Sequence, residues 1–527
     1  MKNILIAIRS IFKKGRHNVM KIVSLGIGLA VGLVLIAKVY FEQSYDDFYP
    51  DRDRVYQVWA KYQQNGGELK DYPQTSGGIA PTMQQQIPEI ETVTRYTSFG
   101  DWTFTMTDTK MKYSGRCIIA DSCFFDILPR PMLIGNAKEV LSTPMYVLVS
   151  SRIAKNIGGD VIGKNFTVDS SPGRTMTIGG VFEEVPENSH SRYDVIVSMA
   201  SAGRFMWEGS PTNMLGNDRY ISYVKLHKGV NPLALEEQVH TFVNSYFPPE
   251  EQQKTGFNIG FSFHELDGLH KELPQVKRMT WILSLLAFAL IFTAVMNYIL
   301  IVISSIVNRS KEVAVHKCYG ASENNIHGMM FGEALVHIVL SLILALLLIL
   351  AFRGTVEELL ATSLDSLLLS NGSLVLLGIC ILVFFVSGFM PGSLYARIPV
   401  ASAFRNYREN KRIWKKALLL VQFVATGFLV TMLVFVARQY TFMVNDRPGY
   451  AYENLAYCGL AGVDSTSRAK ILDEVMRLPG VVAATTVYQL PFEHASGNNI
   501  LLPGETQELF NIADLYWVGN GYLDMME

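Results

Sequence analysis

Residues 279–307 read MTWILSLLAFALIFTAVMNYILIVISSIV, a stretch in which no side chain carries a charge. An α-helix rises about 1.5 Å per residue, so roughly 20 apolar residues cross the hydrocarbon core of a bilayer. A buried helix of a soluble protein is rarely this long without a charged residue. We therefore predict that this stretch is a transmembrane helix and that the chain is a membrane protein.

Four further stretches are long and apolar enough to cross a membrane. The first, residues 22–41, is longer than the apolar core of a signal peptide, so we interpret it as a permanent anchor. The others are residues 328–352, 373–396 and 417–438. The sequence therefore predicts five transmembrane helices in this chain.

The distribution of Lys and Arg predicts the orientation of these helices, because basic residues are retained on the cytoplasmic side. Residues 1–21 hold six basic and no acidic side chains, and the links 308–327 and 397–416 also carry an excess of Lys and Arg. Five helices place all three segments on one side. We expect a multi-pass protein of the bacterial inner membrane with a cytoplasmic N-terminus. The external segments would be residues 42–278, 353–372 and 439–527.

The external segment 42–278 has the composition of a folded α/β domain. Short runs rich in β-branched and aromatic residues are separated by Gly, Asn, Asp and Pro, which is typical of strands and turns. Helix-like stretches lie between them at 78–86 and 233–246. The predicted fold class is an α-helical membrane protein with α/β extracytoplasmic domains. The predicted strands are Val55–Ala60, Tyr146–Val149, Thr175–Val181, Tyr193–Met199 and Tyr220–Leu226.

A weak internal repeat follows the first and the fifth transmembrane helices. Ile87-Pro88-Glu89-Ile90 and Leu478-Pro479-Gly480-Val481 lie at similar distances after these helices, and a β-rich run follows each. The alternative is a common helix–turn–strand unit that occurs twice by chance. The repeat interpretation predicts that residues 439–527 begin a second, incomplete external domain. It also predicts that the protein continues beyond Glu527 with further transmembrane helices.

Two motifs approach those of known catalytic sites without completing them. Residues 158–165, GGDVIGKN, lack the Ser or Thr that a P-loop places after its lysine, and a strand-like run follows. His264-Glu265 has no second histidine four residues further on, as a metalloprotease helix needs. The cysteines show no zinc spacing. Cys117 and Cys123 lie in one external segment, where a disulfide between them is the alternative to the free thiols that we expect. We assign no catalytic residue, no metal site, no cofactor and no nucleic-acid partner.

The link between the second and third transmembrane helices reads NRSKEVAVHKCYGAS over residues 308–322. Gly320 suits the position just past the end of a helix, and Ser322 suits the N-cap of the next one. We therefore predict a short helix that is joined rigidly to two transmembrane helices.

The side chains of this short helix predict an amphipathic surface. Val313, His316 and Lys317 are expected to share one face at helical spacing. The alternative is a helix that only lies on the lipid surface, where anionic lipids attract positive charge. Glu312 and Glu323 dilute that charge, which favours contact with a protein partner.

At this link the chain resembles a known family. Residues 309–335 begin with the pattern R-x-x-E-[VI]-A-V-x-K-x-x-G-A and resemble the coupling segment of MacB/FtsX-type ABC permeases. Residues 44–58 are similar to the family's exit from the first span, residues 78–93 to the start of its periplasmic core domain, and residues 418–423 to the fifth span of its eight-helix members. One departure is His316, where many members carry Arg. The resemblance implies that the residues coupled to an ATPase are Arg309, Lys311, Glu312, Val313, His316, Lys317, Gly320 and Ala321.

The resemblance also implies a function. A permease of this kind has no ATPase site of its own and pairs with a separate cytoplasmic ABC ATPase subunit, which binds the ATP. It acts as a homodimer or with a second permease, and it passes conformational change to periplasmic domains during export or efflux of a substrate, a process called mechanotransmission. A periplasmic adaptor and an outer-membrane channel are further partners that the resemblance suggests, besides the lipid membrane.

Two other functions are weaker interpretations of the same sequence. A membrane-anchored periplasmic sensor or regulator of a cell-envelope process would need a cytoplasmic output module, and an integral membrane enzyme would need a catalytic constellation. Glu333 and His337, near the start of the third transmembrane helix, are candidates for a functional intramembrane site. Anchoring or packing is the simpler interpretation of both residues.

Overall fold

The computed structural model describes residues 17–64, 67–168, 171–216, 218–369, 372–396, 400, 413–446, 449–450, 454–460, 463–491, 496–502 and 508–526. The chain divides into two compact units, which we describe separately. The first unit comprises residues 1–102, 113–165 and 176–428, and the second comprises residues 103–112, 166–175 and 429–527.

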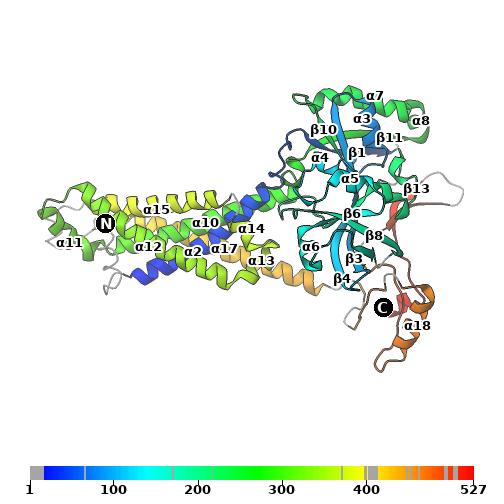
Figure 1. Ribbon diagram of the computed structural model, residues 1–527. Coiled ribbons are helices and arrows are strands. Elements are labelled where there is room, and N and C mark those ends of the chain that lie inside the picture. Colours follow the sequence, from blue (N-terminus) through cyan, green and yellow to red (C-terminus); the bar gives the residue numbers. More distant parts are fainter. Residues whose placement is uncertain are drawn as a thin grey trace. The chain divides into compact units, whose positions relative to one another are not determined.

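Five long apolar helices in the described part of the chain confirm the predicted number of membrane-spanning helices (Figure 1). They are α2 (Asn18–Gln43), α10 (Pro274–Ser304), α12 (Glu323–Ala351), α15 (Ser373–Ala396) and α17 (Ile413–Asn445). Each is long enough to cross the hydrocarbon core. The helices α2, α10, α12 and α15 contact one another and form a bundle within the first unit.

Glycines allow α2 and α10 to approach each other closely. A Cβ atom added at Gly28 would overlap the Cβ of Ala294, and one added at Gly32 would overlap the side chain of Ile291. Lipid tails are as apolar as leucine, so helices in a membrane associate through close packing more than through the hydrophobic effect. The contact between these two helices therefore requires residues without side chains at both positions.

An α/β domain lies between α2 and α10 in the chain, as the sequence predicts. Its strands are β1 (Val55–Gln64), β2 (Lys70–Tyr72), β3 (Ile90–Met106), β4 (Lys112–Ala120), β5 (Met132–Ile134), β6 (Tyr146–Ser150), β7 (Asn165–Val168), β8 (Ser171–Phe182), β9 (Val195–Ser198), β10 (Ile221–Leu226) and β11 (Phe257–Glu265). They form one mixed sheet in the order β11-β1-β10-β3-β4-β9-β6-β8-β5, with β2 beside β1 and β7 beside β3 and β8.

Helices cover the apolar faces of this sheet. The helices of the domain are α3 (Ile79–Gln86), α4 (Phe124–Ile127), α5 (Ala137–Ser142), α6 (Ser151–Ile157), η1 (Met199–Arg204), η2 (Ser210–Thr212), η3 (Pro232–Leu235), α7 (Glu236–Tyr246), α8 (Pro249–Thr255) and α9 (Gly268–Lys271). Met83 of α3 and Phe242 of α7 are buried in one core with β1 and β10. Phe124 of α4 and Leu141 of α5 are buried in a second core with β6 and β9.

The five predicted strands are present as β1, β6, β8, β9 and β10, whereas β2, β3, β4, β5, β7 and β11 lie outside these five runs. The near-miss motifs take strand geometry. Lys164 is followed by β7, so residues 158–165 lack the helix that a P-loop requires, and His264 lies on β11. Cys117 and Cys123 are free thiols. Among the described residues, no group of His, Cys, Asp and Glu could hold a metal ion.

The second unit bears on the predicted repeat. Besides the last part of α17, it contains α18 (Ser465–Met476), the hairpin of β12 (Ser496–Leu501) and β13 (Glu508–Leu515), and α19 (Tyr522–Met526). A helix and a turn precede residue 481, as α3 and its turn precede β3. Of the β-rich run 482–488, residues 482–486 form no strand and Val487 makes an isolated bridge to Val518, so the predicted strand is wrong. Its pairing is limited to this bridge and to two backbone hydrogen bonds, from the N–H of Tyr488 to the carbonyl of Trp517 and from the N–H of Gly519 to the carbonyl of Thr486.

Candidate functional site

A short helix connects two spans at one end of the bundle (Figure 1). This helix, α11 (Ile306–Cys318), is separated from α10 by Ser305 alone and from α12 by residues 319–322. Short connections leave little freedom between consecutive helices. The position of α11 is therefore tied to both spans.

The turn after α11 has the geometry that the sequence predicts. Gly320 adopts a left-handed backbone with φ +86°, which suits glycine. Its N–H donates to the carbonyl of Lys317 at 3.0 Å, and the N–H of Ala321 donates to that of His316 at 3.0 Å. These two bonds are the helix-ending Schellman arrangement. Ser322 then caps α12 through its side chain, so the predicted turn is confirmed.

One face of α11 packs on the bundle. Val313 and Ala314 are each 1% exposed and belong to the same apolar cluster as Met330 of α12 and Tyr395 of α15. Fully burying a valine side chain contributes about 1.5 kcal/mol or more. Apolar packing therefore holds α11 against the ends of the spans in addition to the chain connections.

The opposite face of α11 is exposed and mixes charge with apolar surface. Lys311 and His316 are exposed, Val315 is 43% exposed, and Tyr319 at the end of the helix is 89% exposed. Exposed aromatic residues beside charged ones are common where a protein partner binds. Val315 and Tyr319 were not among the residues that the sequence singled out.

The structure corrects one detail of the predicted amphipathic face. Val313 points into the bundle while His316 is exposed, so the two residues do not share a face. Lys317, one turn after Val313, is half-buried, as is Glu312. A residue four positions further along a helix lies closer to the same face than one three positions further, so Lys317 lies nearer the face of Val313 than His316 does. The side chain of Arg309 lies outside the described residues.

Two ionisable residues of α12 lie inside the bundle. Glu333 and His337 are 6% and 1% exposed. Lys21 of α2 lies 3.7 Å from Glu333, and the hydroxyl of Tyr298 on α10 lies 3.2 Å from Nδ1 of His337. These contacts tie α12 to two other spans, which favours a packing role for both residues.

At the other end of the bundle, a polar turn carries α2 into the α/β domain. Asp46 in this turn is fully buried and has a left-handed backbone with φ +60°. Its N–H donates to the carbonyl of Asn188 at 2.9 Å, and the amide of Asn188 donates to the carbonyl of Ser44 at 2.6 Å. Asn188 lies in the loop 183–194 between β8 and β9. This loop therefore binds the turn through both the backbone carbonyl and the side-chain amide of Asn188.

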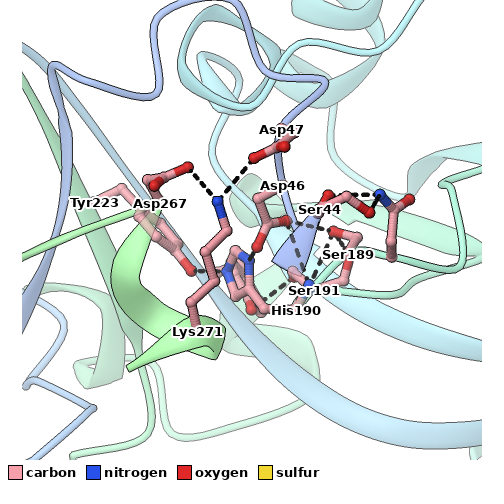
Figure 2. A network of polar contacts seen from close by, with 11 residues as sticks. Ser44, Asp46, Asp47, Ser189, His190, Ser191, Tyr223, Asp267 and Lys271 are labelled. Atoms are coloured by element: carbon pink, nitrogen blue, oxygen red, sulfur yellow. Dashed lines mark hydrogen bonds and ion pairs between the residues drawn. The ribbon is translucent and has the colours of Figure 1, made fainter. Parts of the chain in front are cut away.

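The Asp46 carboxylate is the centre of a buried hydrogen-bond network (Figure 2). Nδ1 of His190 donates to its Oδ2 at 2.7 Å, and Oγ of Ser189 donates to its Oδ1 at 3.0 Å. Nε2 of His190 lies 2.5 Å from the hydroxyl of Tyr223 on β10. We call Asp46, Ser189, His190 and Tyr223 the domain joint, since they connect the end of α2 to a central strand.

Burial keeps the phenols near the domain joint neutral. It raises the pKa of Tyr223 well above the ordinary 10.0, and it raises the pKa of Tyr96 on β3 to about 12. Ser191, next to His190, donates to the hydroxyl of Tyr96 at 2.7 Å. Hydrogen bonds from one loop therefore reach two neighbouring strands, β10 and β3.

Ion pairs beside the domain joint bind α9, the short helix that precedes α10. Lys271 of α9 donates to Asp47 at 2.9 Å and to Asp267 at 2.8 Å (Figure 2). Burial lowers the pKa of the Lys271 amine, but the two hydrogen bonds outweigh this effect and the pKa is raised. His270, also of α9, pairs with Glu42 at the end of α2 at 2.6 Å. The helix α9 thus holds the ends of α2 and α10 together.

The link between α12 and α15 meets the same loop. It contains α13 (Arg353–Leu360) and α14 (Leu364–Leu368). Glu187 of the loop 183–194 accepts a hydrogen bond from the N–H of Ser363 at 3.0 Å. Lys38 of α2 donates to Thr362 at 2.8 Å. The loop 183–194 therefore contacts both the turn after α2 and the link between α12 and α15.

Sequence reasoning did not find the domain joint, because its parts are far apart in the chain. Asp46 and His190 are separated by 144 positions. The local sequence shows only an acidic pair after an apolar run and a polar run at 188–191. Neither pattern identifies a partner without the fold.

Comparisons with known proteins cover both regions. Residues 20–242 match the family model of the MacB-like periplasmic core domain, and residues 284–400 match that of the FtsX-like permease C-terminal region. No curated protein matches the chain. The first matched range includes the domain joint, and the second includes α11.

Several solved structures are similar to parts of the chain. One is a domain of a putative permease protein from Porphyromonas gingivalis, with 32% identity, 41% of this chain and 91% of that chain covered, and a TM-score of 0.38. Another is the periplasmic region of MacB from Actinobacillus actinomycetemcomitans, with 16% identity, 42% and 92% covered, and a TM-score of 0.27. A third is the extracellular domain of the ABC-type transporter YknZ from Gram-positive bacteria, with 10% identity, 39% and 98% covered, and a TM-score of 0.28.

Proposed function

The chain belongs to the MacB/FtsX-type ABC permeases, and we propose that it couples ATP hydrolysis by a separate cytoplasmic ATPase subunit to conformational change in its periplasmic domain. This conformational change drives export of a substrate from the inner membrane or the periplasm. The chain itself carries no ATPase site in this proposal.

The observation that carries the proposal is the attachment of α11. This helix presents Lys311, His316 and Tyr319 outward while Val313 and Ala314 pack on the spans. A partner that binds the exposed face and moves therefore displaces the ends of α10 and α12 with it. Arg309, Lys311, Glu312, Val313, His316, Lys317, Gly320 and Ala321 form the proposed coupling segment, in which Val313 acts from inside by anchoring the helix.

We place α11 in the cytoplasm and the N-terminus on the same side, in a bacterial inner membrane. The family match makes the α/β domain periplasmic or extracellular, and the basic segments 1–21 and 397–416 favour the cytoplasm for the other side. Cys318, an exposed native thiol on α11, offers a test. In a Cys458→Ser background, an impermeant maleimide should label Cys318 only after permeabilisation and label Ser245→Cys of α7 without it. Labelling of Cys318 in sealed cells would reverse the orientation.

The partners follow from the family and from the exposed face. Membership implies an ATPase partner. We further propose that the permease works as a homodimer or with a second permease, and that a periplasmic adaptor and an outer-membrane channel take part in export. The charges of α11 would set register and specificity toward the ATPase more than affinity.

The test is to reconstitute the full chain with the ABC ATPase encoded beside it and to compare ATP turnover with and without the permease. Glu312→Lys should lower the stimulation of turnover by about tenfold, because it places a positive charge among Lys311 and Lys317. The matched control is Glu358→Lys, an exposed charge reversal on α13 outside the coupling segment. Full stimulation in both variants would reduce α11 to a surface anchor, and absence of any complex would overturn the proposed function.

A further inference from the structure

We propose that the domain joint makes the periplasmic domain and the adjoining ends of α2 and α10 move as one rigid body, with His190 as the positioning residue that holds them in register. The inference rests on the proposed function, since it states how movement of the spans reaches the domain. It assigns a mechanical role to residues that contact neither ATP nor a substrate.

The polar network of the domain joint is buried and fully paired. Asp46, Ser189 and Tyr223 are each within 3% of complete burial, and the carboxylate, the imidazole and the phenol all find partners. A buried polar group without a partner costs roughly 1–3 kcal/mol. Any rotation of α2 against the sheet would break these bonds before water could replace them. The network therefore favours a single orientation.

Several connections converge on the domain joint and its surroundings. The loop 183–194 holds Asp46 through His190 and holds Ser363 through Glu187. Independently, Lys271 and His270 of α9 hold Asp47 and Glu42. A movement of one span at this end consequently displaces its neighbours and the sheet together.

The turn that follows α2 and the loop 183–194 that holds it also favour a fixed geometry. Residues 42–54 and 183–194 contain no glycine, and each contains one proline, Pro50 and Pro186. Hinges need residues that absorb large changes in φ and ψ, whereas proline restricts them. The left-handed backbone at Asp46 occurs on a non-glycine residue and is stabilised by its buried contacts. These segments are built as a fixed connection and not as a hinge.

The inference predicts a distance that does not change during the ATP cycle. Spin labels on Ser245→Cys in α7 and Gln275→Cys at the start of α10 report the domain against this end of the bundle, in a background with Cys318→Ser and Cys458→Ser, which removes the exposed thiols. In the reconstituted complex with its ATPase, we expect one narrow distance distribution, equal with and without ATP and vanadate.

Variants at His190 separate positioning from folding. His190→Leu removes both side-chain bonds and should broaden the distribution at least about twofold. His190→Gln keeps a donor and an acceptor and should restore the narrow distribution. Labels at Ser245→Cys and Glu139→Cys, both within the α/β domain, should keep their distance in every variant. If His190→Leu does not fold, Tyr223→Phe, which removes one hydrogen bond, should give a smaller broadening in the same direction.

The outcomes distinguish this inference from the proposed function. A wild-type distance that changes with nucleotide, or a narrow distribution in both His190→Leu and Tyr223→Phe, would overturn the rigid joint. Stimulated ATP turnover sensitive to Glu312→Lys would leave the proposed function standing in that case. A changed distance between the labels at Ser245→Cys and Glu139→Cys in His190→Leu would show that His190 serves folding only. This result would also overturn the inference.

Discussion

The two ends of the bundle handle polar groups in opposite ways. At the α11 end, Lys311, His316 and Tyr319 are exposed, and the apolar residues face the spans. At the domain joint, Asp46 and Tyr223 are buried and satisfied by other residues of the same chain. The α11 end therefore exposes polar groups that a partner can bind, whereas the polar groups of the domain joint bind one another.

The difference follows from the energetics of burial. An exposed ion pair contributes about 1 kcal/mol or less, so the charges of α11 contribute little to the stability of the chain. Breaking a buried, hydrogen-bonded pair costs several times more because the remaining group loses its partner. Substitutions at the α11 end should therefore change binding at constant stability, and substitutions at the domain joint should change stability or geometry. The following predictions test this division.

Gly320→Pro should have the largest effect. Proline fixes φ near −65°, whereas Gly320 has φ +86°, and the substitution also removes the N–H that donates to Lys317. We expect loss of more than about 90% of the permease-stimulated ATP turnover with normal membrane insertion. Gly320→Asn is the matched control, because asparagine tolerates the left-handed region and should retain most of the stimulation. Equal activity of the two variants would mean that the turn does not orient α11.

Asp46→Ala tests how much the buried network of the domain joint contributes to stability. It leaves His190 and Ser189 without their acceptor and keeps the unfavourable backbone at residue 46. We expect the free energy of unfolding in detergent to fall by about 3 kcal/mol. Asp46→Asn should lose less, since its amide oxygen still accepts and asparagine tolerates this backbone. Asp108→Ala, in an exposed turn, serves as the control, and an effect of Asp46→Ala as small as its own would contradict the buried network.

Tyr319→Ala should lower the affinity for the ATPase and leave the stability of the chain unchanged. The side chain is 89% exposed, so its removal should leave thermal unfolding unchanged. If the ATPase receives this ring in a pocket, affinity for the ATPase should fall by about tenfold, which is typical of an aromatic anchor. Cys318→Ala, at the exposed neighbouring position, should bind normally. Titration of the labelled ATPase into permease nanodiscs measures both, and unchanged affinity for Tyr319→Ala would place the contact elsewhere on α11.

The sequence predicts the α11 end well because its determinants are local. The length of the apolar runs identifies the spans, and Gly320 and Ser322 identify the turn within a few residues of the helix they end or begin. The mistake about His316 is also local, since spacings of three and four residues differ by a full 100° of rotation. Burial of Val313 decides which spacing faces the bundle, and burial depends on the neighbouring spans.

The domain joint could not be predicted because its determinants are distant. Nothing near Asp46 in the sequence points to His190, and only the sheet order brings β10 and the loop 183–194 to the same place. The second half of the repeat shows the same limit. Residues 482–488 have a β-rich composition yet form only an isolated bridge, from Val487 to Val518, because an extended ladder depends on the packing of neighbouring segments, which composition alone does not provide.

The smallest predicted effect concerns Asp51, whose exposed carboxylate forms ion pairs with Lys225 and Arg54 beside the domain joint. Hydrogen bonds from Lys225, at 2.6 Å, and from Arg54 hold the pKa of its carboxyl below the ordinary 3.8. A lowered pKa stabilises the folded state above about pH 4, and this contribution is lost as pH falls through the lower, folded-state pKa. Because the side chain is 39% exposed, solvent screening keeps the contribution below about 1 kcal/mol. Asp51→Asn should therefore unfold at a slightly lower denaturant concentration than wild type at pH 7, and the difference should shrink as pH falls below 3.8. Asp101→Asn on β3 is the exposed control, and a difference between Asp51→Asn and wild type that grows on acidification would mean that the carboxylate destabilises the fold.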